Sequence, residues 1–185
     1  MRTLLLVLSL LRTFLSVGQD LRSIERSEVT FVSEASMERI SAASIQCSGV
    51  IDLVQRTFAL QVPVRSFQGF NSPLQREHFN ENYLESGKYP NITFKGRVIE
   101  SLDLSKPGTY RVRAKGELSV HGVMRERIIE CTCVVTEDGI RVTSVFSVTL
   151  SDHAIRVPRV VQTKVASVVN VKVDIRFGPH RSAKR

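Results

Sequence analysis

Residues 110–120 read YRVRAKGELSV, and this stretch decides the fold class. From Tyr110 to Val120 every second residue is apolar or small, whereas the residues between them are charged or polar. Successive side chains of a strand point to opposite faces, so this alternation indicates a strand with one buried and one solvated face. The same pattern recurs at 58–64, 140–150 and 169–177. We therefore expect an all-β chain of antiparallel strands.

Turn signals divide the chain into about eight strands. The pair Asp138-Gly139 between two apolar runs is typical of a hairpin, and the stretches 52–56 and 106–108 are further turns. The expected strands span 28–34, 39–51, 56–65, 90–102, 108–121, 124–136, 140–150 and 166–177. Many hairpin-connected strands with one continuous apolar face predict a sandwich or a closed barrel.

The stretch 66–89 is different because it does not alternate. Ser72 stands directly before Pro73, an arrangement typical of a helix N-cap and first helical position, and a short helix is expected over 72–79. The segment 78–96, HFNENYLESGKYPNITFKG, then places aromatic, Asn and Glu side chains just before a strand. We expect this helix and loop to cap one rim of the barrel.

The N-terminus has the pattern of a secretory signal. Arg2 is followed by an apolar run over 3–11 that is too short to span a bilayer, and small residues precede position 19. We expect a signal peptide at 1–18 and one barrel domain at 19–185, located in the periplasm or secreted. A buried N-terminal helix is the alternative.

The charge balance is basic, but the basic residues are dispersed. Without residues 1–18 the chain loses two of its 26 basic residues and none of its 18 acidic ones, which leaves a formal charge of +6. Most basic residues stand singly along strands, as Arg111 and Arg113 do, and only 180–185 is a cluster. No zinc or RNA-stacking motif accompanies them, so we expect no nucleic-acid partner. Transient contact with a membrane surface is compatible with this charge.

The three cysteines do not form a disulfide framework. Cys131 and Cys133 are two residues apart on one strand face and cannot bridge easily, and the count is odd. We expect three buried free thiols that act as small hydrophobic side chains. A bond from one of the pair to Cys47 is the alternative.

The histidines carry little sign of catalysis. His121 ends a strand just before Gly122, where a turn hydrogen bond is expected. The pair Asp152-His153 can orient a metal ligand, but the metal spacings H-x-H and H-E-x-x-H are absent, and so is the nucleophile motif G-x-S-x-G. We expect no catalytic residue, no metal and no cofactor.

Two motifs carry a resemblance to a known family. Residues 80–94, NENYLESGKYPNITF, resemble the E-S-x-K-Y-P-x-I-T-F segment of the YceI-like family, and 116–123, GELSVHGV, resemble its G-x-L-T-I-H-G-V strand end. Val29–Phe31 and Gly49–Asp52 are similar to its opening strands. The stretches FQGFNSP and LSDHAIRVP suggest the branch found in Bacteroidetes. One departure is Asn82, where many members have Asp.

The resemblance implies an eight-stranded antiparallel lipocalin-like β-barrel, exported to the periplasm, with no established catalytic residue. Family members are associated with binding long isoprenoid chains, such as polyprenyl phosphates or isoprenoid quinones, inside the barrel. By this resemblance we expect the protein to transport or store such a lipid. We expect a monomer or a homodimer.

Candidate ligand contacts follow from the faces of the strands and from the cap. The apolar contacts are expected from inward strand residues and cap residues: Phe58, Phe67, Phe70, Phe79, Tyr83, Phe94, Phe146 and Val148. The headgroup candidates are His78, Asn80, Asn82 and Lys88.

Small inward residues, such as Ala114 and Ser144, either pack against large ones or leave a cavity, and the resemblance favours the cavity. One isoprene unit then contributes at most about 4 kcal/mol, whereas association costs roughly 4–15 kcal/mol, so a long chain is the expected cargo. The alternatives are a small metal-dependent enzyme that uses His78, His121, Asp152 and His153, or a packed barrel that acts as an adaptor through its basic outer face.

Overall fold

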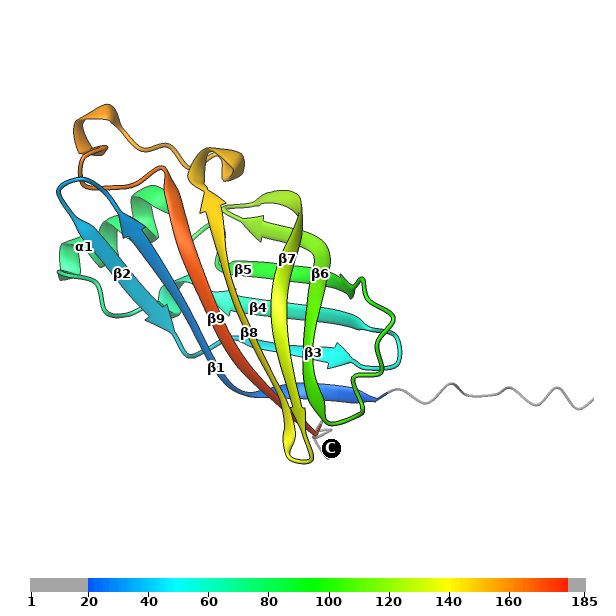
Figure 1. Cartoon of the computed structure of the whole chain (residues 1–185). Helices are drawn as coiled ribbons and strands as arrows, with labels where there is room; N and C mark the ends of the chain where they lie inside the picture. Colours follow the sequence, from blue (N-terminus) through cyan, green and yellow to red (C-terminus); the bar gives the residue numbers. More distant parts are fainter. Residues whose placement is uncertain (1–19, 180–185) are drawn as a thin grey trace, which may run out of the picture.

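A computed structural model describes residues 20–179 of the chain as one closed antiparallel sheet (Figure 1). The predicted signal peptide, His180 and the basic tail lie outside the described residues. The strands are β1 (Leu21–Glu34), β2 (Arg39–Ser44), β3 (Ser48–Asp52), β4 (Thr57–Pro63), β5 (Asn91–Val98), β6 (Gly108–Val120), β7 (Val123–Thr136), β8 (Gly139–Thr149) and β9 (Val168–Pro179). Neighbours in the sheet follow the chain from β3 to β9, and β1 pairs with β9 to close the barrel.

The prediction of an eight-stranded antiparallel barrel is confirmed. Strands β2 and β3 are the two halves of the strand predicted at 39–51, interrupted at 45–47. The C-terminal part of β1 pairs with β2, and its first residues pair with β3. Counted as one strand, β2 and β3 complete a barrel of eight.

The first strand is longer than the predicted 28–34 because it begins at Leu21. Its register against β9 shifts between Ile24 and Arg26, where Glu25 forms a bulge. An extra residue in one strand reverses which side chains face inward. The alternation that marks the strand therefore does not continue through the bulge. For this reason the sequence pattern did not predict the first seven residues of the strand, 21–27.

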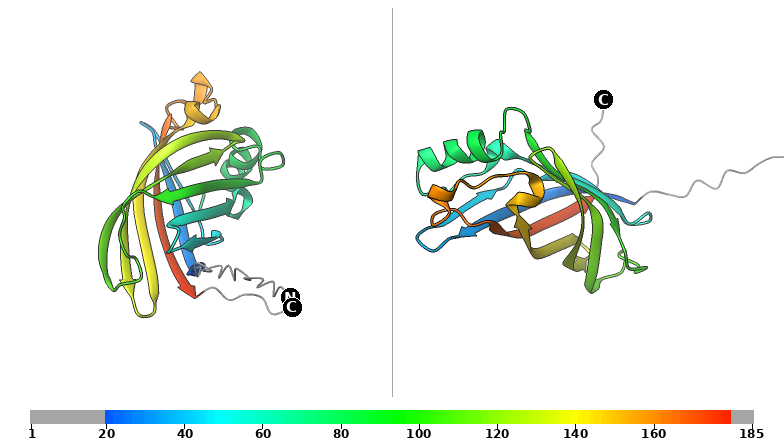
Figure 2. Two further views of the ribbon diagram at one scale, coloured as in Figure 1. Left: turned by 90° about the vertical axis from the view of Figure 1, so that its right-hand side faces the viewer. Right: turned by 90° about the horizontal axis from the view of Figure 1, so that it is seen from above.

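The predicted cap helix is present. Helix α1 (Pro73–His78) begins after Ser72, whose hydroxyl accepts a hydrogen bond from the Gln75 amide at 3.2 Å. A short 3-10 turn, η1 (Val64–Ser66), precedes it, and a π-helical turn, η2 (Phe79–Tyr83), follows it. The connection from β8 to β9 adds the 3-10 turns η3 (Leu150–His153) and η4 (Arg159–Val161) at the same end of the barrel (Figure 2). The sequence did not predict these two turns.

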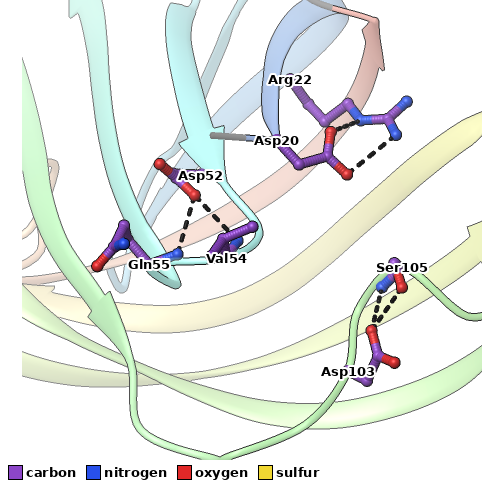
Figure 3. Close-up of polar contacts among 7 residues, drawn as sticks. All are labelled: Asp20, Arg22, Asp52, Val54, Gln55, Asp103 and Ser105. Atoms are coloured by element: carbon purple, nitrogen blue, oxygen red, sulfur yellow. Dashed lines mark hydrogen bonds and ion pairs between the residues drawn. The ribbon is translucent and has the colours of Figure 1, made fainter. Parts of the chain in front are cut away.

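The opposite end of the barrel is closed by loops. Leu53 and Leu104 are buried there with exposed fractions of 7% and 2%. Polar side chains hold the loops: the Asp52 carboxylate accepts hydrogen bonds from the Val54 and Gln55 amides, both at 2.9 Å, and Asp103 accepts from Ser105 (Figure 3). The buried leucines and the ordered loops cover this end of the barrel.

Strands β7 and β8 meet at a seam and are paired over only part of their length. These strands pair only over Thr132–Thr136 and Gly139–Thr143, next to the hairpin turn, and diverge above it (Figure 1). Side chains bridge the rest: the Arg127 guanidinium donates to the Ser147 carbonyl at 2.7 Å, and the Ser144 hydroxyl donates to the Glu130 carbonyl at 2.6 Å.

Candidate functional site

The barrel is hollow. A cavity of about 580 Å³ lies inside the sheet and is lined mainly by apolar side chains from all nine strands and from the cap. Its volume falls in the range of small-molecule binding pockets, roughly 300–1,000 Å³. The exposed lining residues Leu74 and His78 of α1 and Lys164, just after η4, indicate that the cavity reaches the surface at the capped end.

All eight residues predicted as apolar ligand contacts line this cavity. Four come from strands and four from the cap: Phe58, Phe94, Phe146 and Val148, and Phe67, Phe70, Phe79 and Tyr83. They converge because period-2 alternation turns the strand residues inward, while the cap folds over the open end of the same barrel. That they touch a ligand remains a prediction.

An aromatic cluster joins the cap to the wall. The ring of Phe31 on β1 stacks on that of Phe79 with centroids 5.2 Å apart, and it contacts Phe67 at 5.5 Å and Phe70 at 5.9 Å. Aromatic pairs at such distances contribute about 0.5–1.5 kcal/mol each beyond their buried area. The sequence-based site did not include Phe31, although alternation from Val29 would have placed it inside.

The three cysteines line the cavity as free thiols. Cys47 and Cys133 are buried, whereas Cys131 is only half-buried. Burial raises the pKa of Cys47 to about 11 and that of Cys133 to about 12, and it also raises the pKa of Cys131. The thiols are therefore uncharged near neutral pH and form part of an apolar lining.

The structure does not bring the four headgroup candidates together. His78 lines the cavity where it opens, and Asn82 is exposed and lines neither hollow. Asn80 and Lys88 instead line a separate polar cleft of about 970 Å³ on the outer side of the cap. Lys88 lies 4.9 Å from the centre of the Tyr89 ring, and the Asn80 amide donates to the Arg76 carbonyl at 2.8 Å.

His121 connects the cap to the barrel rim. It lies with Gly122 in the two-residue turn between β6 and β7, and both have positive φ, +51° and +72°. Its Nε2 lies 2.9 Å from a Glu85 carboxylate oxygen, and its Nδ1 lies 3.1 Å from the His153 carbonyl. The ring therefore joins Glu85, at the end of the cap, to the end of η3. The expected turn is present, but the side chain holds the cap rather than the turn.

The residues of the metal-enzyme alternative do not converge. His153 is fully buried and its Nδ1 donates to the Val123 carbonyl at 2.9 Å, whereas Asp152 is exposed and His78 lies on α1. Among residues 20–179, no group of three or more His, Cys, Asp or Glu side chains is arranged to hold a metal ion.

None of the helices in this part of the chain is long and apolar enough to cross a membrane.

An antiparallel barrel closed on itself, with an apolar lumen and a helical cap, defines a lipocalin-like binding barrel. Residues 23–177 match the YceI-like domain. The chain belongs to the YceI-like family, as its two motifs indicated.

Several solved structures share the fold. A polyisoprenoid binding domain from Saccharophagus degradans, implicated in plant cell wall breakdown, superposes with a TM-score of 0.75 at 13% identity, over 88% of this chain and 100% of that chain. Burkholderia cenocepacia BcnA gives 0.68 at 16% identity, over 81% and 95%. The Campylobacter jejuni YCEI protein gives 0.58 at 12% identity, over 74% and 82%. A search of curated proteins found no significant match.

Proposed function

We propose that this protein is an exported carrier that holds a long isoprenoid-type lipid in its lumen for transport or storage. The observation that carries the proposal is the hollow barrel: an apolar cavity of about 580 Å³ that opens at one end beneath an aromatic cap. The YceI-like family is a binding-protein family, and its Saccharophagus degradans relative is described as a polyisoprenoid binding domain. A non-enzymatic role fits both.

The cavity suits a chain better than a compact polar ligand. Its wall offers aromatic and branched aliphatic side chains along its length, and its charged groups, Glu38 and Lys164, lie where it opens. Each buried CH₂ contributes about 0.8 kcal/mol, so a chain of several isoprene units exceeds the cost of association where a single unit does not.

The polar end of the cargo then lies at the opening. His78 and Lys164 are exposed lining residues and can donate hydrogen bonds to a phosphate or a quinone carbonyl. Asn80 and Lys88 lie in the outer cleft, which shares Phe70 and Ser72 with the cavity lining. A long headgroup that passes these two residues would reach the cleft.

The cellular setting is part of the same proposal. Export to the periplasm follows from the signal pattern at 1–18, and the carrier role requires contact with membranes that supply and accept the lipid. A single closed barrel holds the cavity without a partner chain, so one protomer is sufficient for binding.

The test is mass spectrometry of an organic extract from the natively purified protein. A polyprenyl phosphate or isoprenoid quinone at a stoichiometry near one would support the carrier and identify its cargo. An extract without lipid, repeated after incubation with total membrane lipids, would refute it.

A further inference from the structure

Three exposed apolar side chains lie in or next to the segments that line the cavity at the capped end. Met37 in the β1–β2 loop is 73% exposed, Leu74 in α1 is 56% exposed and Val160 in η4 is 89% exposed. Leu74 also lines the cavity, as does Val161 next to Val160. More than half of each side chain is in contact with solvent, on three separate segments.

The three segments are held together as one structure, which we call the mouth rim: the loop 35–38, helix α1 and the segment 156–165. The Met37 amide donates to the Thr163 carbonyl at 2.8 Å, which joins the loop to the segment. The side-chain amide of Gln75 donates a hydrogen bond to the Glu38 carboxylate, and this bond joins the loop to α1. Figures 1 and 2 show the three segments at the same end of the barrel, opposite the start of β1.

The charge of the mouth rim is asymmetric. The stretch 153–170 contains no Asp or Glu but carries Arg156, Arg159 and Lys164, all exposed. Within residues 20–179 none of these three cations forms an ion pair. The loop and α1 contribute one more cation, Arg76, and two carboxylates, Glu38 and Glu77, and the neutral Gln75 amide that donates to Glu38 leaves its charge in place. Four cations against two carboxylates give the mouth rim a formal charge of +2, with the unpaired cations of 156–165 beside exposed apolar side chains.

We propose that the mouth rim docks onto the surface of an anionic phospholipid bilayer. Met37, Leu74 and Val160 enter the interface, and the three cations meet lipid phosphates. Apolar contact combined with attraction to anionic lipid is the established physical basis of reversible membrane adsorption. Docked in this way, the cavity opens toward the bilayer, and an isoprenoid chain passes between them without crossing water.

A bilayer fits this surface better than a second copy of the chain. Stable protein interfaces bury about 800 Å² on each partner around a continuous apolar core. The apolar side chains of the mouth rim stand singly on separate segments, with charged residues between them. Lipids adapt to such a discontinuous surface, whereas a folded partner needs complementary shape.

The proposal deepens the carrier function, but its test needs no cargo. The purified protein is sedimented with phosphatidylcholine vesicles, with and without phosphatidylglycerol, at low and high salt. We expect binding to the anionic vesicles alone, weakened by salt. The triple variant Met37→Ser, Leu74→Ser and Val160→Ser should lower the partition coefficient by about tenfold or more.

The chain offers a matched control for the apolar residues. Ile45, Val54 and Val145 are 76%, 49% and 72% exposed, and all lie outside the mouth rim. Serine at these three positions should change the partition coefficient by less than about twofold. Circular dichroism melts establish that both triple variants are folded.

The cations have a control of their own. Arg156→Gln, Arg159→Gln and Lys164→Gln together should remove most of the salt dependence. The same three charges are removed elsewhere by glutamine at residues that are exposed and outside ion pairs within 20–179: Arg97, Arg111 and Lys172. This control variant should retain more vesicle binding than the variant that lacks Arg156, Arg159 and Lys164.

Three results would overturn the docking proposal: no binding of the wild type to anionic vesicles, equal loss in the rim variants and their controls, or a dimer that the Met37, Leu74 and Val160 substitutions dissociate. The last would identify the mouth rim as a protein interface. A protein that carries lipid but does not bind vesicles would refute the docking proposal and leave the carrier proposal in place. Vesicle binding by a protein whose extract stays free of lipid would leave the docking in place and refute the carrier.

Discussion

The substitution Ala114→Phe tests whether the lumen holds the cargo. Ala114 lies on β6 with its side chain directed into the cavity and is 7% exposed. A phenyl ring added there projects into the open space rather than into packed atoms. Ala59 on β4 is exposed on the outer face, so Ala59→Phe makes the same chemical change outside the barrel.

The expected loss of affinity follows from the cavity. The ring adds about six carbon atoms and displaces about one isoprene unit of the cargo, which contributes at most about 4 kcal/mol at roughly 0.8 kcal/mol per CH₂. The chain can shift along the cavity and recover part of that contact. We therefore expect a rise in Kd of about 10- to 100-fold, since about 1.4 kcal/mol corresponds to a factor of ten.

The assay is displacement of a fluorescent polyene fatty acid or prenyl probe, with denaturant unfolding measured in parallel. Ala114→Phe should weaken binding, while its free energy of unfolding stays within about 1 kcal/mol of that of Ala59→Phe, because the ring fills a void. Equal affinities for the two variants would refute the reasoning, since the cargo would then lie outside the lumen. A large loss of stability in Ala114→Phe would show that the interior is packed there.

Three further predictions concern the cap, the seam and the thiols. His121→Ala removes the contacts to the Glu85 carboxylate and the His153 carbonyl, so the free energy of unfolding should fall by about 1–3 kcal/mol; an unchanged denaturant midpoint would contradict this. Arg127→Ala removes a bridge across the β7–β8 seam and should speed amide hydrogen exchange in the upper part of β8, with a stability loss of about 0.5–1.5 kcal/mol; protection equal to the wild type would argue against a bridging role. Alkylation by iodoacetamide at neutral pH should be slow at Cys47 and Cys133, because burial raises the pKa of both thiols and keeps them protonated, and it should accelerate as pH rises toward about 11 and about 12. Bound lipid should slow alkylation further at the half-buried Cys131, as peptide mass spectrometry would show; rapid modification of all three in the folded protein would exclude their place in the lining.

Much of the wall could be predicted from the sequence, because alternation is a local property of strands. The inward faces of β6, β8 and β9 followed directly from the period of two, and the structure places residues such as Val112, Phe146 and Val171 in the cavity lining. Helix α1 was equally local, since Ser72 and Pro73 specify a helix start by themselves. The resemblance of the two motifs to the YceI-like family then indicated that these strands form an eight-stranded barrel.

Where local rules broke, the prediction failed. The bulge at Glu25 hid the first residues of β1. Phe31 lies on the inward face of the part that was predicted, yet it was left out of the site although it is central to the aromatic cluster. The turns η3 and η4 carry no periodic signal, yet η4 lies in the mouth rim. The headgroup candidates were chosen from one continuous stretch, and the fold distributes them between the cavity, the outer cleft and the open surface.

Alternation along a regular strand is enough to assign the inward and outward faces of most of the wall, except beyond the bulge at Glu25. The hollow lumen could be recognised only in the folded barrel. A cavity depends on the distance between walls that meet through pairings such as β1 with β9, and side-chain pattern carries no measure of that distance. The same holds for the mouth rim, since Met37, Leu74 and Val160 become neighbours of one opening only when the barrel closes.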